Sequence, residues 1–144
     1  HAQLIAAAGA TLESVNNFEA AENSYKQSLA EEPNQFMANY GLGKMLYNRG
    51  VDKQEAVNSL DMDNEEGITK LTEERNALWN QAIPYFNAAI AYIDNLDATA
   101  QAQNRSNLFS CLGALKTVYA RFEMYDELKA INARMDALQK AANQ

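Results

Sequence analysis

The sequence has few of the residues that interrupt helices or cross-link a chain. Its 144 residues include two prolines, six glycines and one cysteine, Cys111. A single cysteine excludes an internal disulfide and leaves the redox compartment open. The scarcity of proline and glycine favours long helices over a turn-rich β fold. The length fits one domain and is sufficient to bury a core without disulfides or metals.

Long apolar runs and a basic charge balance are also absent. No apolar run approaches the roughly 18–20 residues that a membrane-spanning helix needs. The formal net charge of −7 argues against a nucleic-acid or anionic-membrane surface, because both require a positive field. The chain begins at His1 without a basic-then-apolar leader. We interpret it as a mature or excised fragment, so the missing signal peptide is uninformative.

Apolar residues recur at helical spacing along most of the chain. They predict helices over residues 2–15, 18–32 and 36–50. Asn16-Asn17 separates the first two helices. Pro33 ends the second, because proline disfavours helix in the residue before it.

The first helix pair has a characteristic order of large, small and aromatic residues. They are Ile5, Ala8, Gly9, Leu12, Ala21, Tyr25 and Pro33. The pair Ala8-Gly9 returns as Leu42-Gly43, and small residues at these positions allow two helix axes to approach closely. This order and its return resemble the tetratricopeptide repeat of about 34 residues. The resemblance implies an all-α fold, an α-α superhelix (a right-handed solenoid) of about three helix hairpins.

In the second pair, the small-then-aromatic signature arrives much later than the repeat length predicts, at Ala82 and Phe86. Helical spacing persists on both sides of an acidic segment, residues 61–67. We therefore predict that both helices of the middle hairpin are extended by roughly three turns, the second running over residues 67–95, or ~42 Å. Pro84 falls inside it and predicts a bend near residues 80–84.

A polar linker, residues 96–103, is expected before a third helix pair with its turn at residues 122–124. Here Lys116 replaces the small residue, and Leu128 and Asn132 replace the small-then-aromatic pair. A more polar last repeat suits the end of a solenoid. We predict a single domain over residues 1–144, with hairpins at about 2–33, 35–95 and 104–141.

Residues 36–140 are similar to one group within this family, the exported tetratricopeptide proteins of the Bacteroidetes type. The similarity implies an elongated middle hairpin near the C-terminus of a longer precursor. It also implies a periplasmic or cell-envelope location. Members of the group mostly lack a defined function. The similar segments are 42–51, 82–86, 104–116, 119–121 and 124–125.

In repeat proteins of this kind the first helix of each hairpin lines a concave face, where partners bind. Aromatic and polar side chains on that face are plausible peptide-binding residues. The alternative is that Tyr40 and Tyr47 pack between repeats. Ala6 and Ala10 stand where a clamp for a C-terminal carboxylate would need polar residues, which argues against that activity. The candidate partner-binding residues are Tyr40, Lys44, Tyr47, Asn48, Thr117 and Arg121.

The sequence offers little for catalysis or metal binding. Asp61, Asp63 and Glu65 resemble the start of a calcium loop, but Gly67 comes one place late and Thr72 replaces the closing glutamate. Cys111 lies on an apolar stripe, as a buried small hydrophobe would. There is no Ser/His/Asp set and no glycine-rich phosphate loop. We predict no enzyme activity, no cofactor and no metal.

These features predict a protein–protein interaction module that binds a protein or peptide through the concave face or the protruding middle hairpin. One alternative is a structural segment that caps a solenoid or dimerises, which an apolar patch on the first helix would favour. Another is a ligand or glycan sensor, which needs a deep pocket with converging polar groups. We expect neither nucleic-acid binding nor membrane insertion, and a homo-oligomer stays open.

Overall fold

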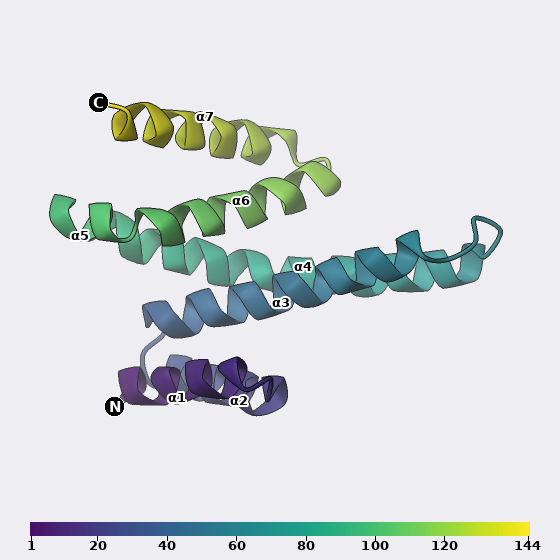
Figure 1. The fold of residues 1–144 in the computed structure, drawn as a ribbon, viewed down its shortest axis with the longest axis horizontal. Coiled ribbons are helices and arrows are strands. Elements are labelled where there is room, and N and C mark those ends of the chain that lie inside the picture. Colours follow the sequence, from purple (N-terminus) through teal and green to yellow (C-terminus); the bar gives the residue numbers. More distant parts are fainter. The chain divides into compact units, whose positions relative to one another are not determined.

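Seven helices and no strand make up the protein in the computed structural model, which describes residues 1–144. The prediction of an all-α fold is confirmed (Figure 1). The chain divides into two compact units, His1–Ala89 and Ile90–Gln144, which are described separately. The single domain over residues 1–144 stays a prediction. The helices are α1 (Ala2–Ser14), α2 (Phe18–Glu31), α3 (Phe36–Asn58), α4 (Glu65–Asp94), α5 (Ala98–Gln103), α6 (Arg105–Arg121) and α7 (Tyr125–Ala142).

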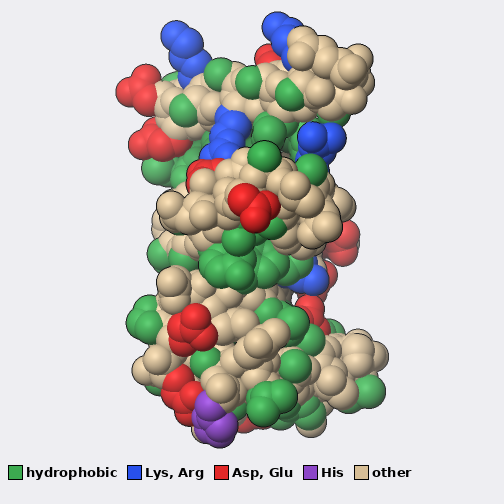
Figure 2. Space-filling view, turned by 90° about the vertical axis from the view of Figure 1, so that its left-hand side faces the viewer, with side chains coloured by type: hydrophobic (Ala, Val, Ile, Leu, Met, Phe, Trp, Pro, Cys, Tyr) green, Lys and Arg blue, Asp and Glu red, His purple; other side chains and the backbone are tan.

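In the first unit, α1 and α2 form an antiparallel hairpin with a tight turn. Asn16 adopts a left-handed backbone conformation, with φ of 63°, which asparagine tolerates better than most residues. The next amide, of Asn17, donates to the carbonyl of Leu12 at 2.9 Å. At the other end of the hairpin, His1 Nδ1 lies 2.8 Å from the Glu31 carboxylate, and Figure 2 shows His1 at the molecular surface.

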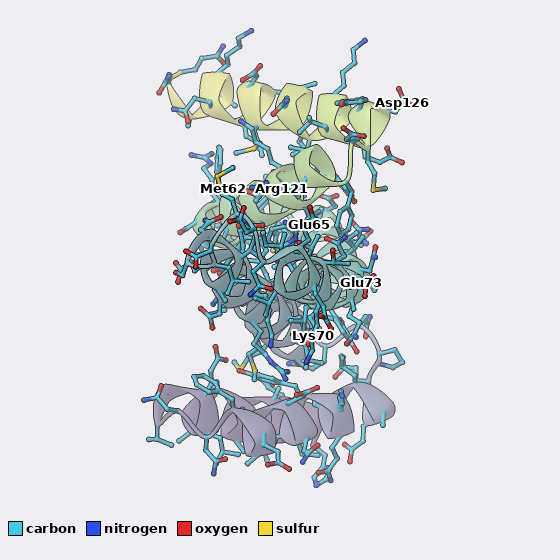
Figure 3. The ribbon with its side chains drawn as sticks, turned by 90° about the vertical axis from the view of Figure 1, so that its right-hand side faces the viewer. Met62, Glu65, Lys70, Glu73, Arg121 and Asp126 are labelled. Atoms are coloured by element: carbon cyan, nitrogen blue, oxygen red, sulfur yellow. The ribbon has the colours of Figure 1, made fainter.

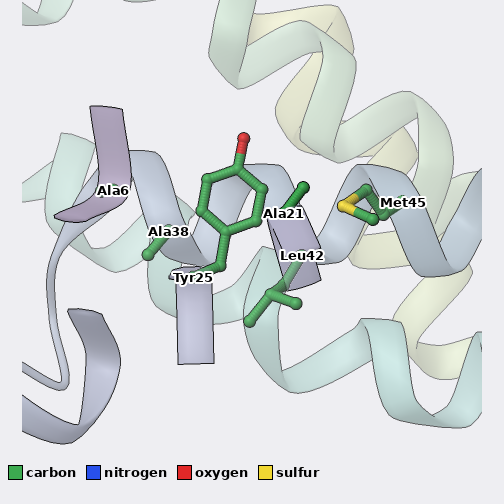
Figure 4. Packing of buried hydrophobic residues seen from close by; sticks show 6 residues of the cluster. All are labelled: Ala6, Ala21, Tyr25, Ala38, Leu42 and Met45. Atoms are coloured by element: carbon green, nitrogen blue, oxygen red, sulfur yellow. The ribbon is translucent and has the colours of Figure 1, made fainter. Parts of the chain in front are cut away.

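Tyr25 of α2 joins three helices in the core of the first unit. Its side chain is 2% exposed and lies against glycines of both α1 and α3. A Cβ atom added to Gly9 would lie 2.8 Å from two ring carbons of Tyr25, and one added to Gly41 would collide with the outer end of the ring. The Tyr25 ring fits at these two positions because glycine has a hydrogen atom in place of a Cβ atom. The surrounding cluster (Figure 4) consists of Ala6, Ala21, Ala38, Leu42 and Met45.

α3 and the part of α4 in the first unit form a long antiparallel arm. Trp79 Nε1 donates to the carbonyl of Tyr47 at 3.0 Å, and Glu74 pairs with Lys53 at 2.8 Å. Residue numbers therefore rise along α3 as they fall along α4. The two long helices predicted on either side of the acidic segment are present, and Figure 1 shows the arm running beyond the α1–α2 hairpin.

The buried Arg75 side chain strengthens the arm. It is 6% exposed, and its guanidinium donates to the side-chain oxygens of Gln54 and Asn76. The guanidinium carbon lies 5.1 Å from the centre of the Trp79 ring, as in a cation–π pair. These contacts hold a charge that would otherwise be costly to bury.

Pro84 lies inside α4, which continues on both sides of it. Proline has no amide hydrogen, so the carbonyl of Asn80 lacks its usual helical donor. The bend near residues 80–84 stays a prediction.

The arm ends in a loop capped by Asn64, whose Oδ1 accepts the amide of Gly67 at 3.0 Å. Figure 3 looks onto this end of the arm, where Met62 and Glu65 are labelled. Met62 is 91% exposed. No group of three or more His, Cys, Asp or Glu side chains is arranged to hold a metal ion, at this tip or elsewhere.

The second unit contains a helix where the sequence predicts only a polar linker. α5 occupies residues 98–103, and its first turn is capped by Asp97 Oδ1, which accepts the amide of Ala100 at 2.8 Å. The linker prediction over residues 96–103 is therefore wrong for most of its length. A short polar helix with a side-chain cap leaves no apolar periodicity to detect.

α6 and α7 form the hairpin of the second unit, and their turn has the same backbone geometry as the turn between α1 and α2. Glu123 has a φ of 56°, and the next amide, of Met124, donates to the carbonyl of Tyr119 at 2.9 Å. No residue of α7 is buried, in agreement with its polar sequence. The buried residues of α6 are Leu108, Cys111, Leu112, Ala114, Leu115, Val118 and Tyr119.

Gly9→Ala and Gly113→Ala should have opposite effects on the free energy of unfolding, because only Gly9 lies against another side chain. Gly9→Ala should lower the free energy of unfolding by about 1–2 kcal/mol, because the new methyl group overpacks the ring. Gly113→Ala adds a methyl group where no atom lies within 4 Å. It should stabilise the chain by about 0.5–1 kcal/mol through helix propensity.

Urea unfolding followed by circular dichroism measures both effects. The fluorescence of Trp79, the only tryptophan, reports on the first unit separately. If Gly9→Ala raised the free energy of unfolding as much as Gly113→Ala, packing of the Tyr25 ring would not require glycine at position 9.

Candidate functional site

Two adjoining hollows on the first unit form the best candidate for a binding site. Their volumes are about 440 and 450 Å³, and Glu13 and Phe18 line both. We call the pair the Phe18 groove. The first hollow is also lined by Glu19, Glu22, Met45, Asn48, Arg49 and Asp52. The second is also lined by Ala10, Ser14, Tyr25, Met37, Tyr40, Gly41 and Lys44.

The groove exists because α3 is longer than the hairpin against which it packs. α1 ends at Ser14 and α2 begins at Phe18, so their turn closes there. α3 continues to Asn58 and runs past that turn (Figure 1). Met45, Asn48, Arg49 and Asp52 recur at helical spacing and therefore share one side of α3. They form one wall of the first hollow, and the start of α2 forms the other.

Phe18 is the most prominent apolar side chain of the groove. It is the first residue of α2 and is 49% exposed. Met37, on the wall of the second hollow, is 36% exposed. Large apolar groups in solvent-accessible grooves act as anchors for a bound partner, because covering them removes apolar surface from water.

The carboxylates of the first hollow differ in how well they are paired. Glu22 lies 2.8 Å from Lys26 and 3.2 Å from Arg49. The hydrogen bond from Lys26, with the positive charges of both partners, lowers the pKa of Glu22 against the opposing effect of burial. Glu19 and Asp52 are exposed and have no hydrogen bond or ion pair of their side chains. They are the carboxylates that remain available to a ligand.

Glu13, shared by both hollows, accepts a hydrogen bond from the hydroxyl of Tyr25 at 2.7 Å. Burial raises the pKa of the Tyr25 phenol, and the bond to the Glu13 carboxylate raises it further. The phenol is thus a fixed hydrogen-bond donor near neutral pH. A raised pKa makes it a poor general base, because its proton is harder to remove.

Three of the candidate residues predicted from the sequence line the groove. Tyr40 and Lys44 lie in the second hollow, with Lys44 Nζ 4.9 Å from the centre of the Tyr40 ring. The other face of Tyr40 is not free, since its ring stacks with Phe36 at 5.5 Å between centroids. Asn48 lies in the first hollow. The groove therefore places Tyr40 and Lys44 together in one hollow and Asn48 in the adjoining hollow.

Tyr47 does not join this set. Its ring stacks on Trp79, with 5.9 Å between centroids, and meets Phe86 edge-on at 6.3 Å. These contacts assign Tyr47 to the packing between α3 and α4 within the arm, whereas the alternative considered from the sequence was packing between repeats. It lines neither hollow of the groove.

Thr117 and Arg121 belong to the second unit and line a different, more open hollow of about 620 Å³. Thr117 Oγ1 donates to the carbonyl of Gly113 at 3.3 Å, within its own helix. Tyr125, which lines the same hollow, is 66% exposed. The two predicted residues thus lie together on a surface that also carries Lys116.

Phe18, Glu19 and Asp52 are not among the site residues that the sequence predicts. In the sequence, Phe18 belongs to an apolar helical stripe, and single charges on a helix are typical of a solvated face. One signal is present: Asp52 continues the series Met45, Asn48, Arg49 at helical spacing. Only the packing of α3 on the α1–α2 turn shows which residues this series faces.

A comparison of the chain with family models, with curated proteins and with solved structures finds no match. Every helix falls short of the combined length and apolar character that a membrane crossing demands.

The environment of Tyr25 predicts a particular loss of stability in alkaline solution. The pKa of the Tyr25 phenol is raised in the folded state. The contribution of this group to stability is therefore complete below the unfolded pKa of about 10 and is lost as the pH rises above that value. Tyr25→Phe should cost about 1 kcal/mol near neutral pH, where the hydrogen bond is lost. It should cost less, or nothing, near about pH 11.

The measurement is the urea midpoint of both proteins at the two pH values, from Trp79 fluorescence. Because the two proteins share every other side chain, the difference between them isolates Tyr25. If the urea midpoints of wild type and Tyr25→Phe differed by the same amount at both pH values, the raised pKa of Tyr25 would be contradicted.

Proposed function

We propose that the chain is a tetratricopeptide-type module that binds another protein and carries out no catalysis. We include in this proposal its origin in an exported, cell-envelope protein, for which the sequence resemblance is the support. The observation that carries the proposal is that one of the glycine–ring contacts of the first helix pair, Gly9 on Tyr25, recurs at the equivalent place in the arm, as Gly43 on Phe86.

The two contacts fall at equivalent places in a repeat. Gly9 faces the ring of Tyr25, and Gly43, one repeat length later, faces the ring of Phe86, with a hypothetical Cβ 3.0 Å from that ring. If the segment 52–78 were absent, Phe86 would follow Gly43 at the same interval as Tyr25 follows Gly9. The same offset aligns Ala82 with Ala21, and both are fully buried. A repeated hairpin with one insertion accounts for this agreement.

The turns support the same interpretation for the last hairpin. Asn16 and Glu123 both adopt a left-handed conformation. In each turn the following amide donates to a carbonyl in the last turn of the preceding helix at 2.9 Å. Counting from these turns, Lys116 corresponds to Gly9. The α6–α7 hairpin thus has the same turn geometry as the α1–α2 hairpin, although Lys116 replaces the small residue Gly9.

The Phe18 groove supports binding as the function. Stacked helix hairpins present extended surfaces on which other proteins bind. Here the surface combines exposed apolar groups with Tyr40 and Lys44, which lie side by side in the second hollow. Aromatic and cationic side chains of this kind are common among residues that dominate binding energy.

The proposal predicts that a partner depends on the groove. Wild type and Tyr40→Ala/Lys44→Ala protein are immobilised and exposed to envelope extract of the source organism, and retained proteins are identified by mass spectrometry. A partner that wild type retains and the folded double variant loses supports the proposal. The control is Met62→Ala, at the exposed arm tip, which should retain the partner.

Loss in Met62→Ala alone would assign binding to the arm instead. Retention of nothing by any of the three proteins would contradict the proposal and favour the structural alternative.

One observation favours that alternative, a segment that caps a solenoid or dimerises. Leu4 and Val15 are 73% and 66% exposed, and their spacing puts both on one side of α1 together with the exposed Ala8. If this stripe is an interface, sedimentation will show a dimer that Leu4→Ser dissociates.

A further inference from the structure

We propose that the Phe18 groove binds a polypeptide segment in which apolar residues adjoin basic ones. This inference rests on the proposed binding function and specifies the chemistry of its partner. It is drawn from the different linings of the two hollows.

The second hollow is suited to apolar side chains. Phe18, Met37 and Tyr40 line it, and the first two are exposed large hydrophobic residues. Tyr25 forms part of its wall, but its hydroxyl is occupied by the bond to Glu13. An apolar side chain placed here would cover the exposed faces of Phe18 and Met37 and remove them from water. Lys44, the cation of this lining, lies over the ring of Tyr40.

The first hollow is suited to positive charge. Its lining includes four carboxylates, from Glu13, Glu19, Glu22 and Asp52, and one cation, Arg49. Glu22 is already paired with Arg49 and Lys26. The two unpaired carboxylates come from different walls, Glu19 from α2 and Asp52 from α3. A lysine or arginine entering between these walls would find an uncompensated negative charge on either side.

The extent of the groove favours a polypeptide over a small cation. The two hollows, of about 440 and 450 Å³, each accommodate several side-chain-sized groups and share Phe18 and Glu13. A ligand that fills both must carry apolar and cationic groups on one chain. An acidic segment is disfavoured in the first hollow by repulsion from Glu19 and Asp52.

The experiment uses two synthetic peptides with a fluorescent label. The first has one leucine between two pairs of lysines, and the second has glutamates in place of the lysines. Binding to the full chain is measured by fluorescence anisotropy at low and at physiological salt. The lysine peptide should bind measurably more tightly than the glutamate peptide, and added salt should weaken its binding.

Two variants locate the site. Glu19→Gln/Asp52→Asn removes the unpaired carboxylates and should weaken binding of the lysine peptide by about threefold to tenfold. The matched control, Glu65→Gln/Glu66→Gln, removes the same charge at the arm tip and should leave the affinity unchanged. Phe18→Ala should weaken binding by roughly tenfold, since it removes the apolar anchor.

Equal weakening by the groove and tip variants would overturn the inference, because it would show attraction by net charge alone. Equal binding of both peptides would also overturn it. These results are distinguishable from failure of the proposed function. If the envelope partner is still lost in Tyr40→Ala/Lys44→Ala, the chain is a binding module and only the chemistry assigned to its partner is wrong.

Discussion

The structure of the first unit depends on an aromatic ring held against glycine. The ring of Tyr25 lies against Gly9 of α1 and against Gly41 of α3, where a Cβ atom would collide with it, so the two glycines allow α1 and α3 to pack closely on α2. The dispersion and hydrophobic terms gained by this fully buried ring are large for a single side chain. Phe86 against Gly43 repeats the arrangement in the arm. With a larger residue at any of these glycines, the helices would have to separate.

The groove follows from that packing together with the length of α3, which the repeat proposal explains by an insertion. The ring contact fixes α3 against the α1–α2 hairpin, and the additional residues extend α3 beyond the turn of that hairpin. Asp52 is the first of the inserted residues under the repeat proposal, and it lies in the wall of the first hollow. A hairpin of ordinary length would end near Gly50 and would keep Met45, Asn48 and Arg49 of this wall but not Asp52. Under the repeat proposal, the insertion would thus have provided one of the two unpaired carboxylates of the groove as well as a longer arm.

Much of the fold could be predicted because its signals are local. The helical periodicity, Pro33 and Asn16-Asn17 locate the first helices, and the acidic segment after α3 locates the arm tip. α5 escapes prediction because its cap, Asp97, is a single residue with no apolar pattern beside it. The candidate site is predictable only in part. Tyr47 shows why, since its place on α3 is compatible with either the surface or the hairpin interior, and Trp79, distant in the sequence, decides between them.

The most direct test of the repeat account is to delete residues 52–78. The deletion joins Val51 to Trp79 and places Gly50 where Asn16 stands in the first turn, a position that needs the left-handed conformation that glycine adopts readily. The account predicts that the shortened chain remains helical and unfolds cooperatively in urea, by circular dichroism and by Trp79 fluorescence alike. A shortened chain that loses its helix content or its cooperative unfolding would contradict the account.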